Sequence, residues 1–109
     1  MSQYWTMGKL IRDRVPELLE RQGVEFTTTV LNDADFAHAL RAKILEEAKE
    51  VAEADTSAAL AEELADLYEV LITLAGHAGF GEQDIRIRAA AKRATHGGFD
   101  GRLFTTSYR

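Results

Sequence analysis

The stretch LEEAKEVAEADTSAALAEELADL, residues 45–67, decides the fold. Counted at about 100° per residue, it contains two helical patterns separated by the short break ADTS. Glu47 stands at the centre of the apolar stripe of the first pattern, and Glu63 at the centre of the second. The apolar residues within about 60° of these glutamates are Phe36, Leu40, Ile44, Val51 and Ala54 on the first helix, and Leu60, Leu67, Val70 and Leu74 on the second. The short break predicts an antiparallel hairpin whose two stripes face each other.

Such a hairpin would bring four acids into one cleft. Glu50 and Asp66 each follow the central glutamate by one turn, displaced by about 60° to the same side. At about 6 Å and an effective dielectric near 20, each like-charged pair repels by roughly 3 kcal/mol. Desolvation adds to this cost, so the arrangement needs cations. Oxygen ligands without cysteine or histidine favour a hard ion, so the sequence predicts a Mg²⁺ site, with Mn²⁺ as a substitute, formed by Glu47, Glu50, Glu63 and Asp66.

The acids have two other interpretations. Acidic helices are commonly solvated faces supported by pairs four residues apart, and Lys43 and Lys49 could be the partners. The repetition of the pattern on neighbouring helices favours the metal site. A di-iron carboxylate bundle requires a histidine three residues after a glutamate on two helices. None of the three histidines, His38, His77 and His96, has that spacing, so His38 and His77 are expected to be packing or surface residues.

The rest of the chain predicts an all-α fold with short irregular segments. Proline and glycine bracket a short helix in PELLERQG, and VEFTTTVL is a short strand or an extended connector. The expected long helices run from about Asp35 to Ala54, from a cap at Thr56 or Ser57 to between Gly76 and Gly79, and from about Glu82 to Thr95. The C-terminal RLFTTSYR is an extended tail.

Composition limits the class of protein. The chain has 109 residues, which fit a single domain, residues 1–109, with 46% hydrophobic and 28% charged residues. A net charge of −5 without a long basic run argues against nucleic acid or an anionic membrane as the main partner. The longest apolar run is too short to span a bilayer, and the first residues lack the apolar core of a secretion signal. With no cysteine in the chain, we expect a cytoplasmic protein.

The second long helix predicts assembly. A broad leucine stripe covers one side, while Tyr68, Ile72 and Ala75 cover much of the other. A helix that is apolar nearly all round is buried on all sides, which a chain this short cannot achieve alone. We therefore expect an antiparallel bundle of about four helices, assembled as a homodimer or homotetramer.

The spacing of the acids also carries a resemblance. The pattern E-E-x-x-E, then twelve residues, then E-x-x-D occurs here as Glu46-Glu47-x-x-Glu50 and Glu63-x-x-Asp66. It resembles the metal-binding motif of the all-α nucleoside triphosphate pyrophosphohydrolases, the MazG-like superfamily. The opening KLIRDRVPELLE and the later AKRATHGGF resemble its house-cleaning branch, so the resemblance extends from Lys9 to about Phe99.

The resemblance implies an activity. Such enzymes cleave the α–β phosphoanhydride of a nucleoside triphosphate into a monophosphate and pyrophosphate, with Mg²⁺ held by the four acids. It further implies that Glu46 orients or deprotonates the attacking water. The alternatives are the pyrophosphohydrolase of histidine biosynthesis that acts on phosphoribosyl-ATP, and a catalytically silent helical dimerisation scaffold.

Basic residues are expected to bind the substrate phosphates. Lys92 lies close in angle to Ile85 on the third long helix, which predicts a lysine on the buried side, and Arg93 is the next candidate. Lys9, Arg12 and Arg14 precede a helix start, where backbone N–H groups favour anions. For the two arginines, surface pairs of Arg12 with Asp13 and of Arg14 with Glu17 are an equal alternative. Tyr4 and Trp5 are assigned to core or interface rather than to the site.

Overall fold

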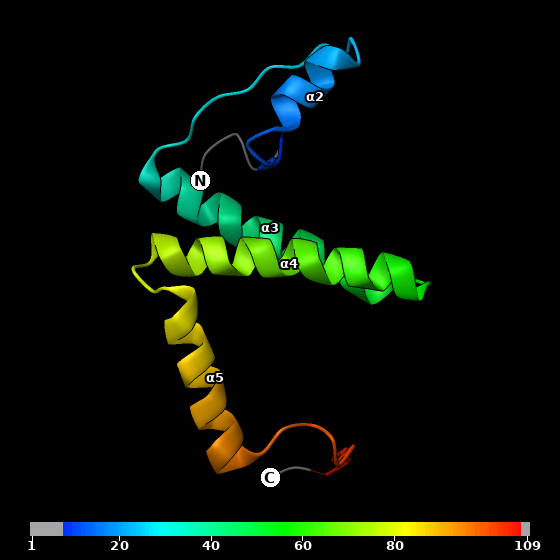
Figure 1. Ribbon diagram of the computed structural model, residues 1–109, viewed down its shortest axis with the longest axis vertical. Helices are drawn as coiled ribbons and strands as arrows, with labels where there is room; N and C mark the ends of the chain where they lie inside the picture. The colour runs from blue at the N-terminus through cyan, green and yellow to red at the C-terminus, as the bar shows by residue number, and fades with distance from the viewer. Residues whose placement is uncertain (1–7, 108–109) are drawn as a thin grey trace.

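The structure, a computed structural model, describes residues 8–107, which contain four helices and no strand (Figure 1). The helices are α2 (Val15–Arg21), α3 (Asp33–Glu53), α4 (Ser57–His77) and α5 (Glu82–His96). The predicted all-α class is confirmed. VEFTTTVL is an extended connector between α2 and α3 rather than a strand. Tyr4 and Trp5 lie outside the described residues.

Local capping fixes where the long helices begin. The Asn32 side chain accepts a hydrogen bond of 2.8 Å from the backbone N–H of Asp35, so α3 starts two residues earlier than predicted. The Thr56 hydroxyl accepts one of 3.0 Å from the N–H of Ala59, which selects Thr56 over Ser57 as the cap of α4. Only residues 54–56 separate the two helices, so they must turn back on one another.

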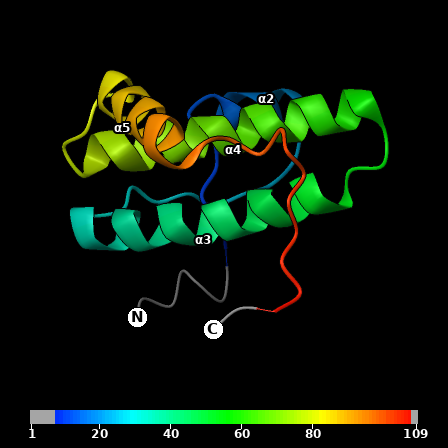
Figure 2. The same ribbon diagram turned by 90° about the horizontal axis from the view of Figure 1, so that it is seen from below.

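The core of the molecule is the α3–α4 hairpin, whose helices run antiparallel along their whole lengths (Figure 2). Ala39 and Leu40 of α3 are buried, and the remaining stripe residues, Phe36, Ile44 and Val51, are half-buried. Leu67, Val70 and Leu74 of α4 are half-buried against them. The ring of His77 meets Phe36 edge-on at 5.1 Å, so this histidine has the packing role expected of it. The predicted facing of the two stripes is confirmed.

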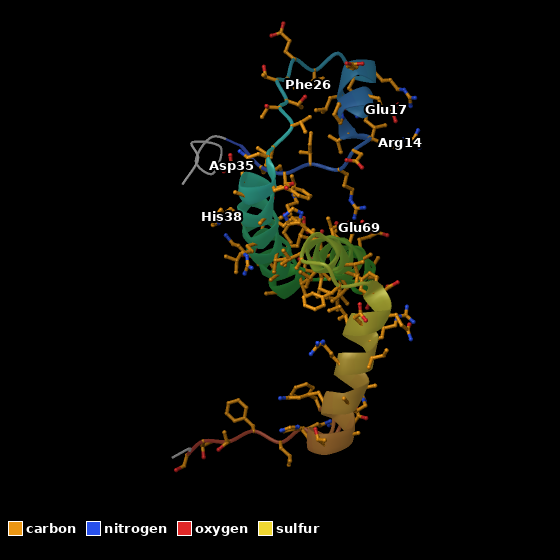
Figure 3. The ribbon with its side chains drawn as sticks, turned by 90° about the vertical axis from the view of Figure 1, so that its left-hand side faces the viewer. Arg14, Glu17, Phe26, Asp35, His38 and Glu69 are labelled. Atoms are coloured by element: carbon orange, nitrogen blue, oxygen red, sulfur yellow. The ribbon has the colours of Figure 1, made fainter. Side chains whose placement is uncertain are left out.

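The other two helices flank the hairpin on opposite sides (Figures 1 and 3). Gly79, with a φ of 95°, ends α4 in a conformation that favours glycine, and α5 then runs away from the hairpin. The Arg88 guanidinium of α5 lies 5.7 Å from the centre of the Phe80 ring, a cation–π contact between the helix and the turn that precedes it. Most of α5 is exposed, so a four-helix bundle is not closed within one chain.

A single chain is too open for a compact domain of its length. Its radius of gyration is 17.6 Å, against about 13 Å for a compact chain of this size. Its accessible surface is 9337 Å², against roughly 6,000 Å² for a compact monomer. Among the described residues only Ala39, Leu40 and Ala75 form a fully buried apolar core. Within residues 8–107 no helix is long and apolar enough to cross a membrane.

Candidate metal centre

The centre of the hairpin holds a cluster of three carboxylates. Glu47 and Glu50 come from α3 and Glu63 from α4, and each offers one oxygen such that all three atoms lie within 4.8 Å of one another. They meet because each central glutamate occupies an apolar stripe position and the stripes face each other. The sequence predicted all three as ligands, and the structure brings them together.

The cluster contains two carboxylate oxygens that no described residue satisfies with a hydrogen bond. Oε2 of Glu47 and Oε2 of Glu63 are shielded from solvent and have no hydrogen-bond partner among the described residues. Glu47 as a whole is 6% exposed, the only buried charged residue in this part of the chain. A buried acceptor without a donor is costly, and a cation between the helices would remove that cost. The donor set therefore fits a hard divalent ion, as Mg²⁺ prefers carboxylate oxygens.

The charges of the cluster disturb the titration of its members. Burial raises the pKa of Glu47, with further contributions from the negative charges of Glu50 and Asp66 that Lys43 partly offsets. A hydrogen bond with Glu50 raises the pKa of Glu63, and desolvation and the neighbouring acids act in the same direction. Without a cation, the two central glutamates therefore bind protons more readily in the folded chain than in the unfolded chain.

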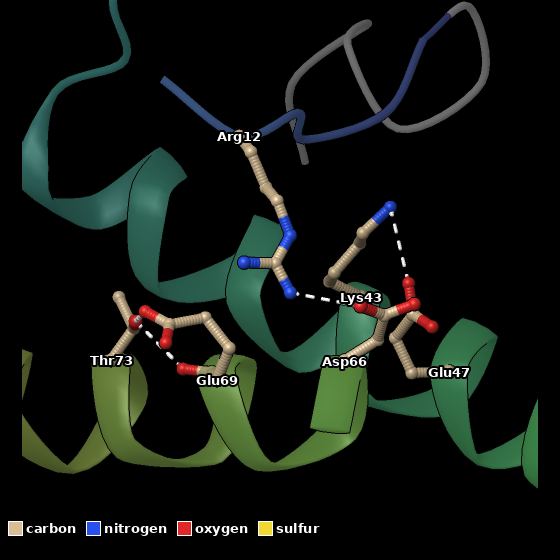
Figure 4. Close-up of polar contacts among 6 residues, drawn as sticks. All are labelled: Arg12, Lys43, Glu47, Asp66, Glu69 and Thr73. Atoms are coloured by element: carbon tan, nitrogen blue, oxygen red, sulfur yellow. Dashed lines mark hydrogen bonds and ion pairs between the residues drawn. The ribbon is translucent and has the colours of Figure 1, made fainter. Parts of the chain in front are cut away.

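Two acids near the cluster, Asp66 and Glu46, are paired with basic residues, and Figure 4 shows the first of these pairs, Arg12 with Asp66. Arg12 Nη2 donates a hydrogen bond of 2.9 Å to Oδ1 of Asp66, the fourth predicted ligand. Glu46 lies between Lys43 Nζ at 3.1 Å and Lys9 Nζ at 3.5 Å. Partial burial acts to raise the pKa of Glu46, but these two lysines outweigh it and lower the pKa. Glu46 is therefore a paired carboxylate and a weak base in this arrangement.

Lys43 is a site residue that the sequence analysis placed only in the alternative interpretation. Its Nζ lies 3.5 Å from Glu47 Oε1 as well as 3.1 Å from Glu46, and its side chain is only 16% exposed. The sequence does contain a signal for this role, because Lys43 stands three residues before Glu46 and four residues before Glu47, the spacings at which helical side chains meet. Because its side chain is largely buried between them, this lysine differs from the basic member of an ordinary surface pair.

The predicted phosphate-binding residues divide into two groups. Lys9 and Arg12 lie beside the acids through the pairs described above. Arg14 forms the alternative surface pair: its Nε donates a hydrogen bond of 2.6 Å to Oε1 of Glu17. Arg12 pairs with Asp66 and not with its sequence neighbour Asp13. Lys92 and Arg93 are exposed on α5, which projects away from the acids (Figure 3), so the expectation of a lysine on a buried face is wrong for the single chain. The helix packs only near its start and leaves that face uncovered.

The pKa directions predict how stability depends on pH and metal. Glu47 and Glu63 have raised pKa values in the folded state. At a pH above their ordinary pKa of 4.5, the folded state therefore binds more protons than the unfolded chain, so the free energy of unfolding falls as the pH rises. The lowered pKa of Glu46 affects stability only when the pH falls below about 4.5, so it does not contribute to this comparison. In EDTA the melting temperature should be higher at about pH 5 than at about pH 8. Mg²⁺ should remove most of this difference, because it binds the ionised carboxylates.

Differential scanning fluorimetry at both pH values, with EDTA or Mg²⁺, measures the effect. Glu63→Gln, which removes one titrating acid, should flatten the pH dependence in EDTA, while Glu62→Gln on the exposed side of the same helix should leave it intact. If both variants show the same pH dependence in EDTA as the unmodified protein, the cluster does not set that dependence.

Comparison of the chain with protein-family models, curated proteins and solved structures finds no match.

Proposed function

We propose that the chain is a Mg²⁺-dependent nucleotide pyrophosphohydrolase that cleaves the α–β phosphoanhydride of a nucleoside triphosphate. The proposal rests first on one observation, the shielded and unpartnered oxygens of Glu47 and Glu63, which point into one carboxylate cluster from two helices. The resemblance of the acid spacing and of KLIRDR to the MazG-like superfamily supports the substrate class and the bond that is cleaved. Surplus or non-standard nucleotides are the proposed substrates.

Each residue near the cluster has a proposed task. Glu47, Glu50, Glu63 and Asp66 would hold the metal, which when bound would neutralise phosphate charge and make a water molecule more acidic. Glu46 orients the attacking water as a hydrogen-bond acceptor, since its lowered pKa suits it less to proton abstraction. Lys9 and Arg12 supply positive charge for the phosphates at the rim of the cluster.

The proposed working form is a homodimer or homotetramer. The support is the openness of the single chain together with an apolar face of α4 that residues 8–107 leave exposed. Leu64, Tyr68 and Leu71 on that face are 48%, 47% and 40% exposed. Lys92 and Arg93 remain candidates for phosphate contacts, but reaching the cluster requires a second chain or a reoriented α5. The absence of cysteine suits a reducing cytoplasm as the place of action.

A panel of standard and modified nucleoside triphosphates, incubated with Mg²⁺ or Mn²⁺, tests the activity. We expect a monophosphate and pyrophosphate in equal amounts, and no turnover in EDTA. Orthophosphate as the first product would contradict cleavage at the α–β bond. Turnover of phosphoribosyl-ATP alone would favour the biosynthetic alternative. The absence of both turnover and Mn²⁺ binding in calorimetry would favour the silent scaffold.

A further inference from the structure

A short basic segment ties the N-terminal part of the chain to the acids of the hairpin. We call residues 9–12 the basic strap. Lys9 Nζ lies 3.5 Å from Oε1 of Glu46 on α3, and Arg12 Nη2 donates 2.9 Å to Oδ1 of Asp66 on α4. Figure 4 shows the Arg12 side chain descending from the strap onto the hairpin. The strap therefore places one cation over each helix at the edge of the carboxylate cluster.

The contact of Arg12 with Asp66 is an exposed ion pair that a competing cation can replace. The side chains are 59% and 40% exposed, and a single hydrogen bond joins them rather than a bidentate fork. Exposed ion pairs of this kind contribute little to stability and are screened by salt. Lys43, in contrast, is largely buried between its two glutamates, so it is the lasting cation of the site and Arg12 the replaceable one.

Asp66 is also part of the electrostatics of the cluster. Asp66 follows Glu63 by one turn of α4, and its negative charge is near enough to act on both Glu47 and Glu63. A divalent ion bound to Glu47, Glu50 and Glu63 would be attracted to Asp66 and would repel the guanidinium beside it. Arg12 holds Oδ1 of Asp66, so an ion that draws this carboxylate into its coordination competes with the guanidinium for it.

We propose that Arg12 is an exchangeable counter-ion of Asp66, which a divalent metal displaces when it binds the carboxylate cluster. The inference rests on the metal site of the proposed function. Arg12 holds the fourth acid while the cluster is without metal and becomes free when the metal takes its place. The released guanidinium then lies at the rim, where an anionic ligand of the metal would meet it. The strap thus couples metal loading to the presentation of a phosphate-binding group.

A double-mutant cycle in Mn²⁺ calorimetry tests the exchange. The proteins are the unmodified chain, Arg12→Ala, Asp66→Asn and the double variant. Because Arg12 competes with the metal, Arg12→Ala should tighten Mn²⁺ binding by about 2- to 5-fold at low salt. In the Asp66→Asn background the same change should have no effect, because the carboxylate that is contested has been removed.

Arg21→Ala is the matched control, since it removes the same charge from an exposed position at the end of α2. It should leave Mn²⁺ affinity unchanged, and thermal melts should show all the variants folded. Unchanged or weaker binding by Arg12→Ala overturns the exchange. Tightening that persists in the Asp66→Asn background also overturns it, because general repulsion would then explain the effect. If the unmodified chain binds no Mn²⁺ at millimolar concentration, the metal site of the proposed function fails as well.

Discussion

Glu47→Gln is expected to lower nucleoside triphosphate turnover roughly 100-fold or more, since even outer partners of metal ligands cost 10–100-fold. The same substitution should raise the melting temperature of the metal-free protein by about 2–6 °C. An amide keeps the shape of the side chain but removes a buried negative charge that has one unpartnered oxygen. Loss of function with a gain in stability would mark Glu47 as a ligand rather than a structural acid.

Steady-state assays and thermal melts in EDTA and in Mg²⁺ measure both effects. Glu53→Gln, at the exposed end of the same helix, is the matched control and should change neither quantity. The Mg²⁺-induced rise in melting temperature should be lost in Glu47→Gln only. Full turnover, or a fall in stability of the metal-free variant, would contradict a role for Glu47 as a metal ligand.

Leu71→Glu is expected to shift the proposed oligomer to monomer, weakening association by about 100-fold or more. Leu71 lies on the apolar face of α4 that the single chain leaves open, 40% exposed, near Leu64 and Tyr68. An interface there would bury this side chain twice in a symmetric dimer, so one substitution acts at two points. The free-energy cost of burying an unpaired charge in that interface adds to the cost of losing the apolar contact.

Sedimentation velocity over a range of protein concentrations measures the association. Leu45→Glu is the matched control, because Leu45 is 73% exposed on the outer side of α3 beside the exposed Lys49. It should leave the oligomer intact. If the unmodified protein is a monomer at high concentration, the oligomer proposal is wrong, and the face of α4 must be explained differently.

The hairpin and three of its acids could be predicted because their causes are local. Asn32 and Thr56 cap the next turn of their own helices, and the stripe positions of Glu47 and Glu63 follow from helical periodicity alone. Because only three residues connect the two helices, they must pack side by side, and burial of their apolar stripes then requires the stripes to face each other. The helix bounds were therefore correct to within two residues where they were tested by such caps.

Features that depend on distant contacts could not be predicted. Arg12 pairs with Asp66, 54 residues away, although Asp13 is its neighbour in sequence. The direction of α5 is set by the backbone at Gly79 and by the Phe80–Arg88 contact, and neither leaves a periodic signal. For the same reason, helical periodicity predicted that Lys92 lies on a buried face of α5. Among the described residues no other element packs on that face, and Lys92 is exposed.

The short connection at residues 54–56 also bears on how the site comes into being. Glu47 and Glu63 are separated by 63 − 47 = 16 positions, so closing the loop between them costs little chain entropy. Contacts of such short range form early and quickly in folding. The cluster can therefore assemble before the strap docks onto it. On the proposed function, the metal would bind while the hairpin folds and act as a template for it, and not only as a ligand of the folded protein.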